Sequence, residues 1–319
     1  MGNVQFAAID IGSNAVRLLI NSVSTEDGDA KLQKLLMVRV PLRLGQESFM
    51  NGKISDVKVK KLIKLMKAFR HLMSVYDVEI YRACATSAMR DAKNAKKLVK
   101  EIFEETDIKI EVIDGKEEAA IIYESHFADT LNSKLNYIFV DVGGGSTEIS
   151  LIVQGEMVQS TSYNIGTVRL LNNKVEESEF DLLHDDLDEI RARYTISDII
   201  GSGGNIIKLN TLANVQKNGK LTLHKLELLY ESMKKQTVDE LMSTYKLRPD
   251  RADVIVPAAG IYVDIAKIVG VDRFIVPRIG LTDGIAHLLY EKWKAKAQKK
   301  SKKELVVETE ETVEEAKNE

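Results

Sequence analysis

The chain reads Phe139-Val140-Asp141-Val142-Gly143-Gly144-Gly145-Ser146-Thr147-Glu148 near its middle and Phe6-Ala7-Ala8-Ile9-Asp10-Ile11-Gly12-Ser13-Asn14 near its start. Each stretch is an apolar strand, an aspartate and a glycine turn, and a second apolar strand follows. Glycine allows a tight turn whose backbone N–H groups come close to a ligand, and serine and threonine add hydroxyl donors. Two such turns facing each other would hold a phosphate chain from both sides, so the sequence predicts phosphoryl chemistry.

The elements around the two turns follow a matching order. Strands are predicted at about residues 4–9, 15–23, 35–44, 79–85 and 109–113, and helices at about 55–75, 92–105 and 116–126. In the second half, strands are predicted at about 137–142, 148–154, 157–163, 198–200 and 273–276, and helices at about 166–173, 179–194, from 206, 223–235, 252–269 and 282–296. Alternation of strands and helices indicates mixed α/β layers, and the repeated order indicates an internal duplication. We expect the ligand between two facing domains.

Composition and charge narrow the class of protein. The 319 residues, 44% hydrophobic, suit two globular domains, and a net charge of −3 gives no reason to expect a nucleic-acid partner. The single cysteine, Cys84, excludes an intramolecular disulfide and a thiolate zinc site. No apolar run reaches the ~20 residues that cross a bilayer, and no basic leader is present at the N-terminus. We expect a soluble cytoplasmic protein without a membrane partner. The predicted limits are 1–127 and 128–282 for two domains, 283–298 for a terminal helix and 299–319 for a charged, disordered tail.

Acidic residues at the turns are the candidate metal ligands. Asp10, Asp141 and Glu148 are the carboxylates that we expect to hold Mg²⁺, directly or through water. The alternative for Asp10 is a strand end with a capped turn, and for Glu148 a solvent-facing carboxylate on a strand. The duplication of the aspartate–glycine turn favours phosphate binding.

Two further motifs offer catalytic groups. Gly115-Lys116-Glu117-Glu118-Ala119 follows a strand and opens a helix, where acidic residues are common because they suit the helix dipole. On the residues alone that structural explanation is the favoured one, although a base orienting water for attack on phosphorus needs such a fixed carboxylate. Arg90 lies one turn into another helix, where its guanidinium could pair with phosphate oxygens.

The glycine turns also supply the candidate phosphate-binding residues. A third loop, Gly201-Ser202-Gly203-Gly204-Asn205, leads into a helix N-terminus, which suits an anion; the alternative is a flexible turn with a helix cap. The predicted phosphate-binding residues are Gly12, Ser13, Asn14, Arg17, Gly143, Gly144, Gly145, Ser146, Thr147, Gly203 and Gly204. Further basic candidates, most of them expected at the surface, are Arg39, Arg43, Arg169 and Lys208.

Seven motifs in order resemble one family, the exopolyphosphatase / guanosine pentaphosphate phosphohydrolase (Ppx/GppA) family. They are Ala8–Asn14, Ala85–Arg90 with Asn94, Gly115–Ala119, Asp141–Glu148, Ile165–Leu170, Gly201–Asn205 and Arg251–Asp253. The resemblance implies a duplicated ribonuclease-H-like fold of the actin-like ATPase, acetate/sugar kinase and Hsp70 superfamily. It implies Mg²⁺-dependent release of a terminal phosphate from inorganic polyphosphate or guanosine pentaphosphate.

The resemblance also implies residue roles. Glu118 would be the general base, Asp141 and Glu148 the carboxylates associated with metal and water, and Arg90 a contact to substrate phosphates. Members of this fold often dimerise, so a homodimer is the expected assembly. The chain departs from the family pattern at Ala120, often arginine in the family, and at Gly280-Leu281-Thr282-Asp283-Gly284, where the family has Gly-Leu-Arg-Glu-Gly. Long members of the family carry extra C-terminal helical domains that help to bind long chains, and the sequence given stops after the two-domain core, so processive action on long polymers is a weaker expectation.

Two other functions stay open at this point. One is an ATP-dependent sugar or acetate kinase of the same superfamily, which would need an acceptor site. The other is a non-catalytic, actin-like nucleotide-binding protein, which would bind nucleotide and hydrolyse it slowly. The retained Glu118, Asp141, Glu148 and Arg90 argue against the non-catalytic alternative.

Overall fold

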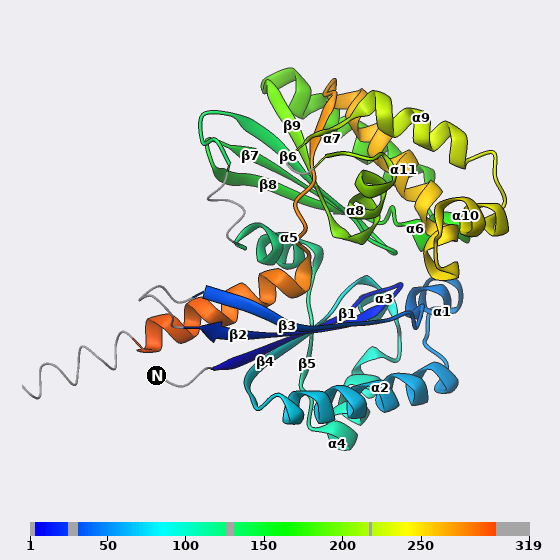
Figure 1. The fold of residues 1–319 in the computed structure, drawn as a ribbon. Coiled ribbons are helices and arrows are strands. Elements are labelled where there is room, and N and C mark those ends of the chain that lie inside the picture. The colour runs from blue at the N-terminus through cyan, green and yellow to red at the C-terminus, as the bar shows by residue number, and fades with distance from the viewer. Residues whose placement is uncertain (1–3, 25–30, 126–130, 217–218, 298–319) are drawn as a thin grey trace, which may run out of the picture.

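A computed structural model describes residues 4–24, 31–125, 131–216 and 219–297 of the chain. The first described sheet has the strand order β3-β2-β1-β4-β5 (Figure 1). Its strands are β1 (Gln5–Ile11), β2 (Val16–Ser24), β3 (Lys31–Val40), β4 (Val78–Ala85) and β5 (Ile110–Val112). The first three strands form an antiparallel meander, and β1, β4 and β5 run parallel.

The second sheet repeats this arrangement. Its order is β10-β11-β9-β6-β7-β8, so β6, β7, β8, β9 and β11 correspond to β1 to β5. The strands are β6 (Asn136–Val142), β7 (Thr147–Val153), β8 (Glu156–Tyr163), β9 (Ile196–Ser202), β10 (Leu221–Thr222) and β11 (Arg273–Ile275). The antiparallel and parallel pairings are also repeated. The predicted duplicated ribonuclease-H-like α/β fold is therefore confirmed.

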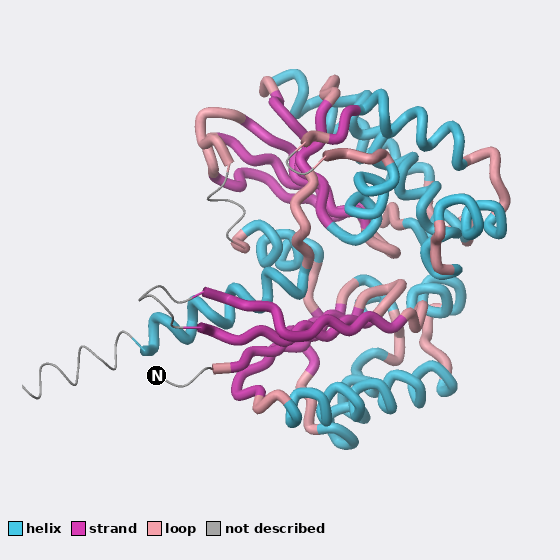
Figure 2. The backbone as a smooth tube through the Cα atoms, in the orientation of Figure 1, coloured by secondary structure: helices cyan, strands magenta, loops and turns pink. Residues whose placement is uncertain are grey.

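Helices cover the two sheets (Figure 2). Those of the first half are α1 (Leu44–Asn51), α2 (Asp56–Val75), α3 (Ser87–Asp91), α4 (Ala95–Thr106) and α5 (Gly115–Tyr123). Those of the second half are α6 (Thr167–Leu171), α7 (Glu177–Arg193), α8 (Gly203–Leu212), α9 (Leu223–Met233), α10 (Val238–Tyr245) and α11 (Pro249–Val269), followed by a last helix at 281–297. Among the described residues, no helix is both long and apolar enough to span a membrane.

The spacing of apolar residues explains which helices could be predicted from the sequence. Helix α2 was predicted from six apolar side chains that recur every three or four residues, and these six are buried: Val59, Leu62, Ile63, Met66, Phe69 and Met73. Ser55 caps it by accepting a hydrogen bond from the Lys58 backbone N–H, as expected. Helices α1 and α10 and strand β10 were not predicted. Both helices have eight residues and β10 has two, too few for a clear periodic pattern.

The last helix returns to the first half of the molecule, where it lies along the first sheet (Figure 1). Its apolar residues Leu281, Ile285 and Leu289 belong to the same buried cluster as Phe6 and Leu19 of that sheet. The connection after β11 therefore joins the two halves near their centre. The domain limits proposed above stay a prediction, and the tail at 299–319 lies outside the described residues.

A second set of contacts joins the halves beside α1. Val168 of α6 and Val254 of α11 are buried in the core of the first half. Arg43 pairs with Asp253 across the same junction. The two glycine turns lie between these two connections, so the fold positions them facing each other.

Candidate active site

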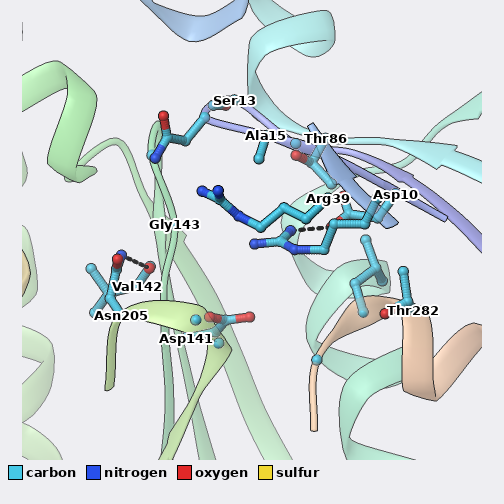
Figure 3. A pocket seen from close by; sticks show the side chains of 18 of the residues that line it. Asp10, Ser13, Ala15, Arg39, Thr86, Asp141, Val142, Gly143, Asn205 and Thr282 are labelled. Carbon is cyan, nitrogen blue, oxygen red and sulfur yellow. Dashed lines mark hydrogen bonds and ion pairs between the residues drawn. The ribbon is translucent and has the colours of Figure 1, made fainter. Parts of the chain in front are cut away.

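One cavity of about 270 Å³ lies between the two sheets and collects most of the predicted residues. Figure 3 shows Asp10 and Arg39, from the first sheet, on one side of it and Asp141, from the second sheet, on the other. The predicted site residues that line it are Asp10, Gly12, Ser13, Asn14, Arg17, Glu118, Asp141, Gly143, Gly144, Ser146, Gly203 and Gly204. The expectation that both turns face one shared crevice is confirmed.

Close packing accounts for part of the glycine-rich sequence. A Cβ atom on Gly145 would lie 2.3 Å from Cζ of Phe49 and 2.5 Å from Oγ of Ser87. The carbonyl oxygen of Gly145 accepts a hydrogen bond of 2.6 Å from Nε of Arg169. Gly145 does not line the cavity. Glycine is needed at this position because α1 and α3 lie too close to leave room for a side chain. Such a packing role was not part of the prediction for Gly145, which was proposed as a phosphate-binding residue.

Thr147 also faces away from the cavity walls. Its side chain is fully buried, and its hydroxyl group donates a hydrogen bond of 2.5 Å to the carbonyl oxygen of Ile165. The backbone of Thr147 pairs with Tyr163 of β8. In this structure Thr147 therefore holds the strand that follows the turn, whereas Ser146, one residue earlier, lines the cavity.

Four carboxylates gather around the cavity, of which Asp10 and Glu148 are buried and Glu118 and Asp141 are partly buried. The pKa of each of these four carboxyl groups is raised, and burial is the largest cause in every case. For Glu118 the next causes are the charge of Glu148 and then the charge of Asp141. Burial and Glu148 raise the pKa of Asp141 to about 7, and burial likewise raises the pKa of Asp10 although Arg17 opposes it. Burial raises the pKa of Glu148 too, against hydrogen bonds that lower it. The carboxylates repel one another, so a cation at this place would be bound favourably.

Glu148 lies behind the cavity wall. It stands opposite Asp141 in the antiparallel pair β6–β7. Its Oε1 atom accepts hydrogen bonds from the hydroxyl groups of Ser146, at 2.6 Å, and Ser162, at 2.9 Å. With 2% of its surface exposed, Glu148 is not the solvent-facing carboxylate that the sequence allowed as an alternative.

Arg90 is held by the protein rather than exposed in the cavity. Its Nη1 donates a hydrogen bond of 2.9 Å to the carbonyl oxygen of Ile113 and lies 3.8 Å from Oε2 of Glu118. It is absent from the cavity lining. This arrangement lets Arg90 fix the loop before α5 and offset part of the negative charge near Glu118.

The expected metal ligands do not form a ready-made site. The described residues contain no group of three or more His, Cys, Asp or Glu side chains arranged to hold a metal ion. Asp10 is paired with Arg17, and Oε1 of Glu148 is occupied by two hydroxyl groups. Mg²⁺ is commonly held by one or two carboxylates together with substrate phosphates. The oxygen donors present, with Asp141 facing the cavity, fit that kind of site.

A group of arginines lines part of the cavity, and of these only Arg17 was predicted from the sequence as a phosphate-binding residue. Arg39, expected at the surface, lines the cavity beside Arg17, and Arg251 and Arg278 join them. Burial, followed by the charges of Arg39 and Arg17, lowers the pKa of Arg251 to about 10. Arg251 also donates a hydrogen bond of 2.6 Å to the carbonyl oxygen of Gly204. Clustered guanidinium groups suit a polyanionic ligand.

The remaining polar cavity residues come from several segments. Those not proposed as site residues include Lys34, Thr86, Ser87, Thr167, Asn205 and Thr282. The position of Arg39 could have been predicted from the sequence. Arg17 and Arg39 lie at similar distances from the predicted turn between their two strands, so they are expected opposite each other. Arg43 and Arg169, also named as candidates, instead form ion pairs with Asp253 and Asp91. Lys208 does not line the cavity.

Comparison with known proteins shows which family the chain is similar to. A model of the Ppx/GppA phosphatase family matches residues 22–292. The crystal structure of the Aquifex aeolicus member of the Ppx/GppA protein family superposes with a TM-score of 0.72 and is 27% identical, covering 92% of this chain and 99% of the other. The fold described above is thus shared with a solved member of that family.

The chain covers only part of the length of the curated relatives. A bifunctional 3-dehydroquinate synthase/phosphatase of Fusobacterium nucleatum is 28% identical over 85% of this chain and 44% of its own length. Exopolyphosphatase 2 of Mycobacterium tuberculosis is 30% identical over 53% of this chain and 54% of its own. Guanosine-5'-triphosphate,3'-diphosphate pyrophosphatase of Aeromonas hydrophila is 23% identical over 88% of this chain and 58% of its own. The chain spans about half the length of the curated relatives it matches.

Proposed function

The chain belongs to the Ppx/GppA phosphatase family, and we propose from this premise that it is a phosphohydrolase. It would release the terminal phosphate from inorganic polyphosphate or from guanosine pentaphosphate, the substrates that the names of its relatives suggest. One observation carries the proposal: Glu118 and Asp141 share a single cavity with both glycine turns and a group of arginines. Hydrolysis of a phosphate chain requires a carboxylate that activates water and cationic groups that bind the phosphates.

The phosphate chain would lie along the turns and the arginines. Backbone N–H groups at Gly12 and Ser13 and at Gly143 and Gly144 would hold the non-bridging oxygens, since such turns form anion-binding concavities. Arg17, paired with Asp10 in this structure, would exchange that partner for a phosphate oxygen. These contacts would orient the terminal phosphorus for in-line attack.

Glu118 would act as the general base. Burial and the charge of Glu148 hold its pKa well above the usual range of a glutamate, and a carboxylate with a raised pKa is a stronger base. Its Oε2 atom, 3.8 Å from Nη1 of Arg90, accepts no hydrogen bond among the described residues, so it keeps the capacity to accept one from a water molecule that enters with the substrate. Glu118 would orient that water and take its proton as the oxygen attacks phosphorus.

Mg²⁺ belongs to this proposal as the expected cofactor. When bound, it would neutralise charge on the phosphates, and Asp141 is the cavity carboxylate best placed to hold it, with Asp10 and Glu148 as the other predicted ligands. The cytoplasmic location and the homodimer expected from the sequence likewise stay proposals.

A phosphate-release assay tests the function directly. The purified protein is incubated with polyphosphate, guanosine pentaphosphate, ATP or pyrophosphate, each with Mg²⁺ and with EDTA. We expect release from polyphosphate or guanosine pentaphosphate that requires Mg²⁺ and that stops in the Glu118→Gln variant. Turnover confined to ATP in the presence of a sugar or acetate would instead identify a kinase. Nucleotide binding with negligible hydrolysis of all four compounds would identify an actin-like binding protein.

A further inference from the structure

We propose that Ser162 is a positioning residue whose hydroxyl group fixes the carboxylate of Glu148 for the reaction. The inference rests on the phosphohydrolase function proposed above. Ser162 lies on β8 and is not part of the cavity lining, so it would act through Glu148 and not on the substrate.

The register of the second sheet creates this contact. Strands β7 and β8 are antiparallel, and Glu148 stands directly opposite Ser162. Directly opposite residues in an antiparallel pair point to the same face of the sheet, with their Cβ atoms about 5 Å apart. The hydroxyl group of Ser162 thereby reaches Oε1 of Glu148 and donates a hydrogen bond of 2.9 Å.

Two donors converge on the same carboxylate oxygen. Ser146 donates to Oε1 of Glu148 at 2.6 Å from the glycine turn, and Ser162 donates from the neighbouring strand. Hydrogen bonds to an ionised carboxylate are shorter and stronger than those between neutral groups. Together the two donors hold the carboxylate from two directions. Ser146 lines the cavity and can change its partner when substrate binds, whereas Ser162 is a support from behind.

Ser162 also touches the helix that carries the proposed base. A Cβ atom on Gly115, the first residue of α5, would lie 2.4 Å from Oγ of Ser162 and 3.1 Å from Oε1 of Glu148. Helix α5 therefore begins directly against the Ser162–Glu148 hydrogen bond. Glu118 follows Gly115 by about one helical turn. The hydroxyl group of Ser162 thus lies where Glu148 meets the start of the helix that carries Glu118.

The chain provides a matched control two residues away. Ser160 lies on the same strand and the same face, opposite Ser150, and the two hydroxyl groups are 2.9 Å apart. Ser162→Ala and Ser160→Ala therefore each remove one hydroxyl group from β8, but only the first removes a donor to Glu148. Supporting partners of a metal site typically contribute about 10- to 100-fold to activity or metal affinity.

The first experiment compares kcat, KM and the unfolding temperature of the two variants on the substrate found for the wild-type protein. We expect Ser162→Ala to lower kcat about 10- to 100-fold with KM within about twofold. Ser160→Ala should keep both constants near the wild-type values, and both variants should unfold at similar temperatures. Equal loss of kcat in the two variants, or an unchanged kcat in Ser162→Ala, would overturn the proposal.

A double-mutant cycle separates action through Glu148 from action through α5. If Ser162 acts through Glu148, Ser162→Ala causes no further loss of kcat in a Glu148→Gln background. An undiminished loss in that background would reject the proposal.

A crystal structure of Ser162→Ala gives a readout that does not need turnover. We expect the Glu148 carboxylate to leave its wild-type position in Ser162→Ala and to keep it in Ser160→Ala. If the wild-type protein hydrolyses none of the substrates, the proposed function fails, while a displaced carboxylate would still support the structural part of the inference. An undisturbed carboxylate in Ser162→Ala would reject it whatever the substrate.

Discussion

Arg17 and Arg39 stand directly opposite each other on β2 and β3, and both line the cavity. Like charges at opposite positions of an antiparallel pair repel each other. The protein offsets this repulsion internally, since Arg17 pairs with Asp10 and Arg39 lies 2.6 Å from Asp250. A bound phosphate chain would interact favourably with both guanidinium groups at once.

Pyrophosphate should therefore stabilise the folded protein. At a concentration about 100 times its Kd, a ligand that binds only the native state adds about 2.7 kcal/mol to the free energy of unfolding. We expect a rise in unfolding temperature in EDTA that shrinks with added salt and is largely lost in Arg39→Gln. Arg70→Gln, an exposed arginine of α2 away from the cavity, is the control. An equal rise in wild type and Arg39→Gln would contradict the role of Arg39.

Replacing Glu118 by glutamine should separate binding from chemistry. Loss of a general base typically lowers the rate about 10²- to 10⁴-fold. Because the glutamine side chain keeps the shape of the site, pyrophosphate binding measured by calorimetry should stay close to that of the wild type. The variant should also resist heat better at pH 7, since one of the mutually repelling buried carboxylates is gone. Full phosphate release by Glu118→Gln would exclude Glu118 as the base.

Asp141 should make the stability of the metal-free protein depend on pH. Its pKa is raised from 3.8 to about 7, mainly by burial and then by the charge of Glu148. Below pH 3.8 it is protonated in both the folded and the unfolded state and has no effect. As the pH rises toward 7 the unfolded state loses the proton first, so the folded state is progressively destabilised. Asp141→Asn should flatten this decline of unfolding temperature in EDTA, and an identical pH profile in wild type and variant would refute the shift.

Cys84 should be inert in the folded protein. Its side chain is fully buried, and burial raises the pKa of the thiol to about 12, so hardly any reactive thiolate exists near neutral pH. Ellman's reagent at pH 8 should detect no thiol in the native protein and one per chain in guanidinium chloride, because Cys84 is the single cysteine. Rapid reaction of the native protein would show that β4 opens readily.

The last helix should contribute strongly to stability. Ile285 is fully buried against the first sheet, and truncation of such a side chain to alanine costs about 2–5 kcal/mol of unfolding free energy. We expect Ile285→Ala to lower the denaturant midpoint markedly. Lys292→Ala, an exposed position of the same helix, should leave it nearly unchanged. Equal midpoints for the two variants would mean that the helix is not docked as described.

Local patterns were sufficient for much of the fold. The apolar spacing of residues 59–73 indicated α2, and the two aspartate–glycine turns marked corresponding strand ends in both halves. The turns predicted that Asp10 and Asp141 face one cavity, and the family resemblance added Glu118, which lines the same cavity. Short elements such as α1 and α10 were missed because one or two helical turns carry little periodic signal, and contacts with other segments stabilise them.

The direction of individual side chains was harder to predict. Thr147 and Ser146 are neighbours in one motif, yet only Ser146, which lies in the turn, lines the cavity, whereas Thr147 begins β7 and its hydroxyl group bonds to Ile165. Ser162 carries no motif that distinguishes it from Ser160, and only the β7–β8 register puts it against Glu148. The contacts that these side chains make could not be inferred from residue type.

By itself the sequence determined the duplication, the order of the longer strands and helices and the position of the two turns, because these depend on spacing and residue preference within short windows. The tertiary structure alone decided that Arg39 and Arg251 meet Arg17, that residues 281–297 return to the first sheet and that Ser162 supports Glu148. These contacts join segments far apart in the chain. They arise only when packing of the two halves fixes their relative positions, and no local pattern encodes that arrangement.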